Sequence, residues 1–324
     1  MEAVLQCLEK QNYPAGLFEV ILVNDWSADK SFDIATAYCS KNENFRLINN
    51  KDGKFGKKEA VNYGIQQARH DLIVTTDADC TMSENWLASY SSFQSKNNAD
   101  LIIGLVDMDS GTGILGKFQE TEFLSLIASG AGAAAYGKPL FCNAANMAFK
   151  KSSLAPEGDR RGRKTVSGDD TFLLHAFKKK HKKILLLKSG ESLVKTNPLP
   201  SWSLYINQRR RWLSKARYYN DTSTVYTGLL VLMLNLAWIT GFLLLVAGIN
   251  FWLLPVIFAV KTFADVFLLD ALFRFLGKKC NKFTIMLLEA FYPFFIVWVV
   301  ISGWCKGFSW KERGYGRTGL PKHF

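Results

Sequence analysis

Two aspartates separated by one residue, Asp77 and Asp79, directly follow an apolar run at residues 71–76. Carboxylate oxygens are ligands that Mg²⁺ and Mn²⁺ prefer, and Mg²⁺ held by one or two carboxylates often bridges substrate phosphates. An Asp-x-Asp pair alone is a weak signal, because aspartates are common in turns. Its place after a strand-like run favours a divalent metal site.

Asp25 lies in a polar turn that follows another strand-like run, Phe18–Val23. At the end of a strand, its carboxylate could hydrogen-bond the base or ribose of a nucleotide. The alternative is an Asx turn followed by a cap for a helix that begins near Ser31. The two interpretations are compatible, so Asp25 is a candidate nucleotide-binding residue.

Lys57 and Lys58 follow Gly56 at the start of a helical pattern that extends to Ala68. The free amides and the macrodipole of a helix start attract anions, and the lysines add positive charge. These residues therefore fit a phosphate-bearing ligand. The alternative is a solvated helix start.

A second acidic pair, Asp169 and Asp170, follows a basic, glycine-containing segment. A carboxylate here could act as general base toward an acceptor hydroxyl. Capping of the helix predicted at residues 171–178 is the common alternative role of such aspartates.

The sequence Gln208-Arg209-Arg210-Arg211-Trp212 combines amide, guanidinium and indole groups on one predicted helix, residues 202–219. Arginine stabilises diphosphate charge, and the face of an indole can stack on a sugar. The alternative is a basic helix next to a membrane that touches lipid headgroups. Contact with lipid alone would suit Arg209 and Arg210.

The elements that must position these side chains alternate between strands and helices. Strands followed by helices of about 10–15 residues predict an α/β fold with a parallel sheet covered by helices. Ligands of such sheets bind beyond the carboxyl ends of the strands, where Asp25 and Asp77 lie. The predicted strands are 18–23, 45–48, 71–76, 100–106 and 184–187, and the predicted helices before residue 100 are 2–12, 31–40, 57–68 and 84–95.

Three apolar segments close the chain: Thr224–Ile249, Phe251–Phe273 and Phe283–Trp304. The first carries no charge and exceeds the roughly 20 residues that span a bilayer. Buried helices of a soluble protein are the alternative for the other two. Three full spans after a cytoplasmic domain would place the basic C-terminal tail outside, against the positive-inside rule. We therefore expect one of the last two segments not to cross.

Charged residues occur within the last two apolar segments. Lys261 and Asp265 are four residues apart, so on a helix they face the same side and could form an ion pair. The third segment carries only Glu289.

The formal net charge is +12, and the basic residues cluster on either side of the apolar region. This placement fits a membrane partner. No module interleaves arginine with aromatic side chains, so we expect no nucleic-acid partner. The six cysteines form no Cys-x-x-Cys pair and the four histidines are dispersed, which argues against structural zinc and suits a reducing, cytoplasmic setting.

Taken in order, these segments resemble the inverting family 2 glycosyltransferases, which have a GT-A fold and include cellulose, chitin and hyaluronan synthases. The Asp25 turn resembles the family's nucleotide-binding aspartate, Lys57-Lys58 its basic helix start, and Asp77-Ala78-Asp79 its metal-binding Asp-x-Asp. Residues 141–149 resemble the acceptor-side segment, 168–171 the Gly-Glu-Asp-Thr segment, and 208–212 the Gln-x-x-Arg-Trp motif. The resemblance covers residues 1 to about 215.

The resemblance implies transfer of a sugar, with inversion, from a nucleotide-sugar donor of the UDP-sugar class to a lipid-linked or polysaccharide acceptor. Mg²⁺ or Mn²⁺ would be the cofactor. The implied roles are metal binding by Asp79 and Asp77; donor binding by Asp25, Lys57, Lys58 and Asp77; catalysis by Asp170 as base with Asp169, Gln208, Arg211 and Trp212; and acceptor binding by Asn143, Asn146 and Trp212.

The chain also departs from the family pattern. The family's first strand, with its Pro-x-x-Asn-Glu segment, is absent, so the start is expected to be truncated or the donor site incomplete. Ala144 replaces a glycine and Asp169 a glutamate. The competing interpretations are a catalytically degenerate membrane scaffold and a nucleotidyltransferase.

We expect three regions along the chain. Residues 1–220 would form a cytoplasmic GT-A catalytic domain, residues 221–305 a multi-pass transmembrane region of the cell inner membrane, and residues 306–324 a basic tail.

Overall fold

The computed structural model describes residues 1–50, 56–111, 113–154, 169–249, 252–305, 308–310 and 313–315. The chain forms two compact units. The first contains Met1–Asp107 and Ala133–Asn197, and the second contains Met108–Gly132 and Pro198–Phe324. The predicted catalytic domain, residues 1–220, therefore contributes two of its segments, 108–132 and 198–220, to the second unit.

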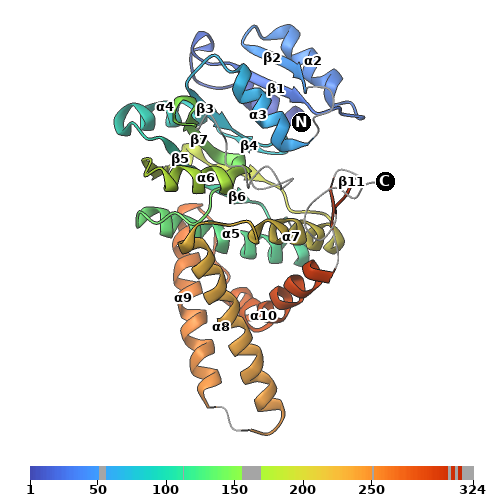
Figure 1. The fold of residues 1–324 in the computed structure, drawn as a ribbon, viewed down its shortest axis with the longest axis vertical. Coiled ribbons are helices and arrows are strands. Elements are labelled where there is room, and N and C mark those ends of the chain that lie inside the picture. Colours follow the sequence, from blue (N-terminus) through green and yellow to red (C-terminus); the bar gives the residue numbers. More distant parts are fainter. Residues whose placement is uncertain are drawn as a thin grey trace. The chain divides into compact units, whose positions relative to one another are not determined.

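The first unit contains a parallel pair of strands, β1 (Val20–Asn24) and β2 (Phe45–Asn49), flanked by helices α2 (Ser31–Lys41) and α3 (Lys57–Gln67) (Figure 1). In the register of this pair, Asn24 lies opposite Asn49. Because the strands are parallel, their polar ends lie at one edge. The predicted strands and helices here are confirmed, with ends that differ by a few residues.

The main sheet has the strand order β3-β7-β5-β8, formed by Leu72–Thr75, Met147–Lys150, Leu101–Ile103 and Ile184–Leu186. β5 and β8 are parallel, but β7 runs antiparallel to both of its neighbours, β3 and β5. The prediction of a parallel sheet is wrong for β7. Parallel neighbours need a crossover connection, usually a helix packed on the same sheet. The connection that precedes β7 instead passes through the second unit, because the chain leaves the first unit after Asp107 and re-enters it at Ala133.

The predicted strand at residues 100–106 is two strands, β5 and β6 (Val106–Met108), separated at Gly104. β6 joins β4 (Thr81–Met82) and β9 (Val194–Thr196) in a small second sheet. The remaining elements that the structure describes in the first unit are α1 (Glu2–Glu9), α4 (Trp86–Asn97), α6 (Asp169–Lys179) and the 3-10 turns Ala15–Leu17, Ala144–Asn146, Lys151–Ser153 and Gly190–Ser192.

A hydrophobic core lies between the main sheet and α6. It contains the buried residues Leu101, Ile103, Ala134, Cys142, Met147, Phe149, Leu174 and Phe177. This core packs α6 against the main sheet. Asp170 lies at the start of α6, and Asp77 follows the end of β3.

Asn146 is completely buried and joins four segments of the first unit. Its Oδ1 accepts hydrogen bonds from Trp86 Nε1 at 2.9 Å and Tyr90 Oη at 2.8 Å. Its Nδ2 donates to the carbonyl oxygens of Leu105 at 2.7 Å and Ser192 at 2.8 Å. All four hydrogen-bonding positions of the amide are thus used within the protein.

Gly104→Ala is expected to destabilise the first unit, because Gly104 packs directly against this amide. A Cβ there would lie 2.3 Å from Tyr90 Oη and 2.6 Å from Asn146 Nδ2. Overpacking and the loss of buried hydrogen bonds should cost about 3 kcal/mol, or a thermal midpoint roughly 5–10 °C lower. Thermal denaturation of the purified protein would measure this. Gly16→Ala, where nothing lies within 4 Å of the added carbon, is the matched control and should leave the midpoint unchanged.

The second unit is built from α5 (Ile114–Ala135, up to Gly132), α7 (Trp202–Ala216), α8 (Thr222–Val246), α9 (Leu253–Phe275) and α10 (Lys282–Cys305), with a short hairpin of β10 (Phe308–Trp310) and β11 (Arg313–Tyr315). α8 and α9 lie side by side as a hairpin, and α10 contacts α7, α8 and α9 (Figure 1). The predicted basic tail lies outside the described residues, apart from β10 and β11.

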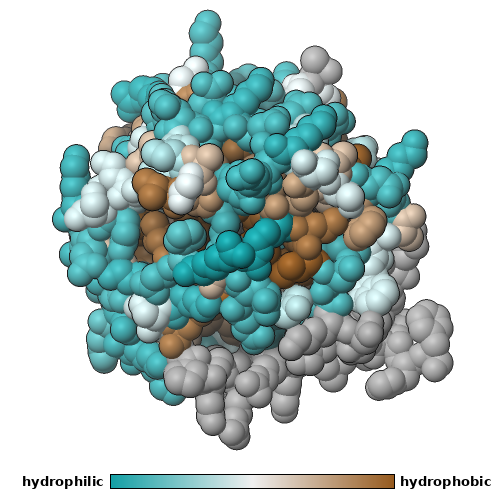
Figure 2. All heavy atoms as spheres, turned by 90° about the horizontal axis from the view of Figure 1, so that it is seen from above, coloured by the Kyte–Doolittle hydropathy of each residue, from teal (hydrophilic) through white to brown (hydrophobic). Residues whose placement is uncertain are grey.

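Two helices, Thr222–Val246 and Lys282–Gly303, are long and apolar enough to cross a membrane by length and composition. Only 17% and 22% of their most apolar windows are buried inside the protein, so most of these residues are exposed in Thr222–Val246 and exposed or half-buried in Lys282–Gly303. By contrast, the face on the side of α2 and β2 is largely hydrophilic (Figure 2). All three predicted apolar segments are helical, but α9 does not meet the same criterion.

The charges of α9 explain that difference. Lys261 Nζ lies 3.0 Å from Asp265 Oδ2, which confirms the predicted i,i+4 pair, and it also contacts Glu289 of α10. Asp265 and Glu289 thus share the ammonium group of Lys261 instead of facing an apolar phase without an ionic partner.

Candidate active site

Asp25 follows β1 and holds the start of α3. Both of its carboxylate oxygens accept the Gly56 amide at 3.0 Å, and Oδ1 also accepts from Asn50 Nδ2 at 3.0 Å. Gly56 has a φ of 107°, which favours glycine. Side-chain turns of the predicted kind occur at its neighbours, where Asn24 Oδ1 accepts from Ser27 N and Asp29 Oδ1 accepts from Ser31 N. The predicted helix cap is not formed, because the N-cap residue of α2 is Lys30 and no side chain caps this helix.

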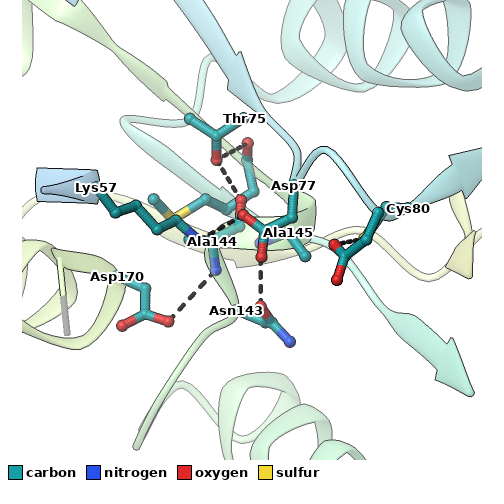
Figure 3. A network of polar contacts seen from close by, with 10 residues as sticks. Lys57, Thr75, Asp77, Cys80, Asn143, Ala144, Ala145 and Asp170 are labelled. Atoms are coloured by element: carbon teal, nitrogen blue, oxygen red, sulfur yellow. Dashed lines mark hydrogen bonds and ion pairs between the residues drawn. The ribbon is translucent and has the colours of Figure 1, made fainter. Parts of the chain in front are cut away.

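Lys57 is the first residue of α3 and reaches the end of β3. Its Nζ lies 2.5 Å from Asp77 Oδ1 (Figure 3). Gly56 and Lys57 therefore bond two aspartates, Asp25 and Asp77, that are far apart in the sequence. The predicted basic helix start lies where a phosphate group could compete with Asp77 for the lysine.

Asp79 is exposed, two residues beyond Asp77. Its Oδ1 lies 3.8 Å from Cys80 Sγ, and among the described residues no ion pair holds it. Burial raises the pKa of the Cys80 thiol to about 12, and the charges of Asp79 and Asp77 add to this increase. The turn after β3 therefore carries two carboxylates, of which Asp77 is paired with Lys57.

A divalent metal fits these carboxylates. No cluster of three or more His, Cys, Asp or Glu side chains that could hold a metal occurs in the part of the chain that the structure describes. The protein would thus supply one or two carboxylate ligands, from Asp79 and Asp77. Mg²⁺ is commonly held in this way, with water and substrate phosphates completing the shell.

The segment at Asn143 and Ala144 lies beside the same strand end. Thr75 Oγ1 donates to the Ala144 carbonyl at 2.7 Å, and Asn143 Oδ1 accepts from Ala145 N at 3.0 Å. Figure 3 places Asn143, Asp77, Lys57 and Asp170 around one region. Thr75 was not among the predicted site residues, although it directly precedes the acidic segment.

Asp170 lies at the N-terminal end of α6. Its Oδ1 accepts from Thr171 N at 2.7 Å, and its Oδ2 lies 3.4 Å from Ala144 N. The predicted helix-capping role is thus compatible with a carboxylate directed toward the Asn143–Ala144 segment (Figure 3). Gly168 and the side chain of Asp169 lie outside the described residues.

Asn146 does not fit its predicted acceptor-binding role. Its side chain is 0% exposed, and all of its hydrogen-bonding positions are used inside the first unit. The structure contradicts this prediction because the side chain points into the protein, whereas that of Asn143 is partly exposed.

The Gln-x-x-Arg-Trp residues lie on α7, in the second unit. Gln208, Arg211 and Trp212 are all partly exposed, as candidate binding residues should be. Arg209 and Arg210 have protein partners: Arg209 is buried against Glu122 of α5, and Arg210 Nε donates to Ser302 Oγ at 3.1 Å. The interpretation that these two arginines contact only lipid headgroups is therefore wrong. A pairing across 87 residues leaves no local signal in the sequence.

The first part of the chain matches a known family. Residues 1–155 match the family model described as "Glycosyl transferase family 2". Glycosyltransferase GlyG of Streptococcus pneumoniae serotype 4 is 31% identical over 104 residues, which are 31% of this chain and 34% of GlyG. Poly-beta-1,6-N-acetyl-D-glucosamine synthase of Staphylococcus epidermidis is 31% identical over 111 residues, 34% of this chain and 26% of the synthase. This chain spans about a third or less of these curated relatives.

A solved structure resembles most of the chain. The mannosyltransferase PcManGT from Pyrobaculum calidifontis, determined in complex with GDP-Man and Mn²⁺, has a TM-score of 0.55. The two chains are 15% identical, over 93% of this chain and 82% of PcManGT. At this identity, the similarity establishes the GT-A-like α/β fold.

Proposed function

We propose that this chain, whose residues 1–155 belong to glycosyl transferase family 2, transfers a sugar from a nucleotide-sugar donor to an acceptor hydroxyl with inversion. The observation that carries the proposal is the bonding of Gly56 to Asp25 and of Lys57 to Asp77. These contacts unite the ends of β1 and β3, where ligands of α/β sheets bind. Asp170 provides a further carboxylate in the same unit.

On the donor side, Asp25 faces the base or ribose, and Lys57 and Lys58 face the diphosphate. Lys57 can exchange Asp77 for a phosphate oxygen, since both are anionic acceptors of its ammonium group. Asp79, with Asp77, would hold Mg²⁺ or Mn²⁺. When bound, that ion supplies charge neutralisation of the diphosphate leaving group. The support is the exposed Asp79 carboxylate; PcManGT, with the same fold, was determined with GDP-Man and Mn²⁺.

On the acceptor side, Asp170 takes the proton of the attacking hydroxyl. A bond forms from the acceptor oxygen to the anomeric carbon while the bond from that carbon to the diphosphate oxygen breaks, so the configuration inverts. The proton ends on Asp170 and the electron pair on the nucleoside diphosphate. Asn143 contacts the acceptor, Arg211 stabilises the leaving group, Gln208 assists catalysis, and Trp212 stacks on the acceptor sugar.

We further infer that the enzyme is a membrane protein with its catalytic unit on the cytoplasmic side. The apolar helices α8 and α10, of which only a minor part is buried inside the protein, and the basic residues that flank the apolar region support this. A lipid-linked or polysaccharide acceptor suits that location. Among the relatives, the Staphylococcus epidermidis protein is named as a polysaccharide synthase.

A donor screen tests the proposed function. The full chain in detergent, with Mn²⁺ or Mg²⁺, would be incubated with UDP-glucose, UDP-N-acetylglucosamine, UDP-galactose and GDP-mannose, and release of nucleoside diphosphate would be measured. We expect metal-dependent release from one donor. Asp79→Ala should abolish it, and Asp33→Ala, an exposed carboxylate on α2, should not. A folded wild-type protein that releases nucleotide from no donor would refute the proposal in favour of a degenerate scaffold.

A further inference from the structure

The helix that carries Gln208 and Trp212 is held by buried contacts on more than one side. Gln119 of α5 binds both backbone groups of Leu199, just before α7, at 2.9 Å each. The ring of Tyr205 stacks on Phe295 of α10, with centroids 5.7 Å apart. α7 is therefore fixed against α5 and α10 within the second unit.

The most deeply buried charge on α7 is Arg209, which is 6% exposed. Its guanidinium makes a two-point contact with the Glu122 carboxylate of α5: Nε donates to Oε1 at 3.0 Å, and Nη2 donates to Oε2. Burial alone would lower the pKa of Arg209, but the charge and hydrogen bonds of Glu122, together with Tyr205 and Tyr292, raise the pKa above its usual value. The guanidinium is therefore charged and held in one orientation.

Arg209 also fixes the direction of the Gln208 amide. Its Nη1 donates to Gln208 Oε1 at 2.7 Å. A guanidinium has only donors, so the carbonyl end of the amide must face it. The NH₂ end of Gln208 is thereby turned away from Arg209 and can only donate.

The same guanidinium covers aromatic rings on its own helix. Its central carbon lies 4.4 Å from the ring centroid of Tyr205 and 4.2 Å from that of Trp212. These residues are four before and three after Arg209, so they share its helix face. A cation over one face of the Trp212 indole leaves the opposite face for another partner.

We propose that Arg209, locked by Glu122, is a positioning residue for the acceptor: it makes Gln208 a hydrogen-bond donor to an acceptor oxygen and leaves one face of Trp212 for the acceptor sugar ring. This inference rests on the proposed function and deepens it. Neither Arg209 nor Glu122 touches the reacting atoms.

Two double variants separate positioning from packing. Glu122→Leu with Arg209→Met removes the buried charges together, a replacement that proteins often tolerate. Glu122→Arg with Arg209→Glu restores an ion pair but places a carboxylate, which can only accept hydrogen bonds, beside Gln208. The amide of Gln208 must then turn its NH₂ group toward that carboxylate. Arg210→Met is the matched control, because this neighbouring arginine contacts Ser302 and lies over Trp298 at 5.7 Å, away from Gln208 and Trp212.

The measurement uses the full chain, the donor found active with wild type, and the methyl β-glycoside of the same sugar as the acceptor probe. Donor hydrolysis without the probe and transfer with it are followed separately, together with the thermal midpoint. We expect both double variants to raise the KM for the methyl glycoside about tenfold. Donor KM and donor hydrolysis should stay within twofold of wild type, as should all values for Arg210→Met.

Three results would overturn the proposal. An unchanged KM for the glycoside in both double variants would exclude a positioning role. A wild-type KM for the glycoside in the charge-reversed variant alone would mean that Arg209 acts only as one half of an ion pair. Loss of donor hydrolysis in parallel with transfer would mean a purely structural role. Failure of the proposed function is distinguishable, since wild type itself would then release no nucleotide.

Discussion

Asp170→Asn is expected to lower kcat for transfer about 10³-fold, within the range that general bases contribute. The asparagine retains the shape of the side chain and an oxygen that can accept from Thr171 N, now 2.7 Å from Asp170 Oδ1. It cannot take the proton of the attacking hydroxyl. The KM for the donor should change little, because the donor contacts belong to other residues. Initial rates at saturating donor, with the thermal midpoint as a test of folding, would measure this.

Asp33→Asn on α2 makes the same chemical change on an exposed carboxylate outside the site, and should retain wild-type rates. If Asp170→Asn turns over at the wild-type rate, Asp170 is not the base. A loss of activity with an equal loss of folded protein would make it a structural cap of α6.

Asp79→Asn is expected to lower kcat/KM about 10³-fold and to abolish the response to added Mn²⁺ or Mg²⁺. Metal ions contribute several kcal/mol to stabilisation of the leaving group, and 1.36 kcal/mol corresponds to a tenfold rate. Since Asp79 is exposed and held by no ion pair among the described residues, its neutralisation should leave the fold unchanged. Initial rates across a metal titration would measure the effect.

Asp77→Asn serves as the comparison in that titration. Asp77 is bonded to Lys57 and only partly exposed, so we expect the variant to keep a metal response through Asp79, at a lower rate. An unchanged metal-activation curve in Asp79→Asn would contradict the assignment of this residue as a ligand.

The sequence allowed the strand-end aspartates to be predicted because each follows an apolar or β-branched run, and such patterns are local. Asp25 and Asp77 indeed follow β1 and β3. The order of the strands was not predictable in the same way. β7 lies antiparallel between β3 and β5, and it follows residues 108–132, which belong to the second unit. The hydrophobic periodicity of the sequence gives no information about this path of the chain.

Side-chain direction was the other limit. Asn143 and Asn146 lie in one motif-like segment, yet the first is partly exposed and the second completely buried. Spacing alone cannot distinguish them in an irregular segment. Arg209 illustrates the same point: a run of three arginines suggests a solvated face, but burial against Glu122 depends on a helix 87 residues earlier in the chain.

The division of the chain has a practical consequence for dissecting the protein. The polypeptide passes between the two units three times, after Asp107, Gly132 and Asn197. A fragment that simply ended at residue 197 would retain all of α5 but not Arg209, so Glu122 would lose its counter-ion. An autonomous α/β fragment would instead require excision of residues 108–132 and rejoining of the ends, so that no orphaned helix remains to misfold or aggregate.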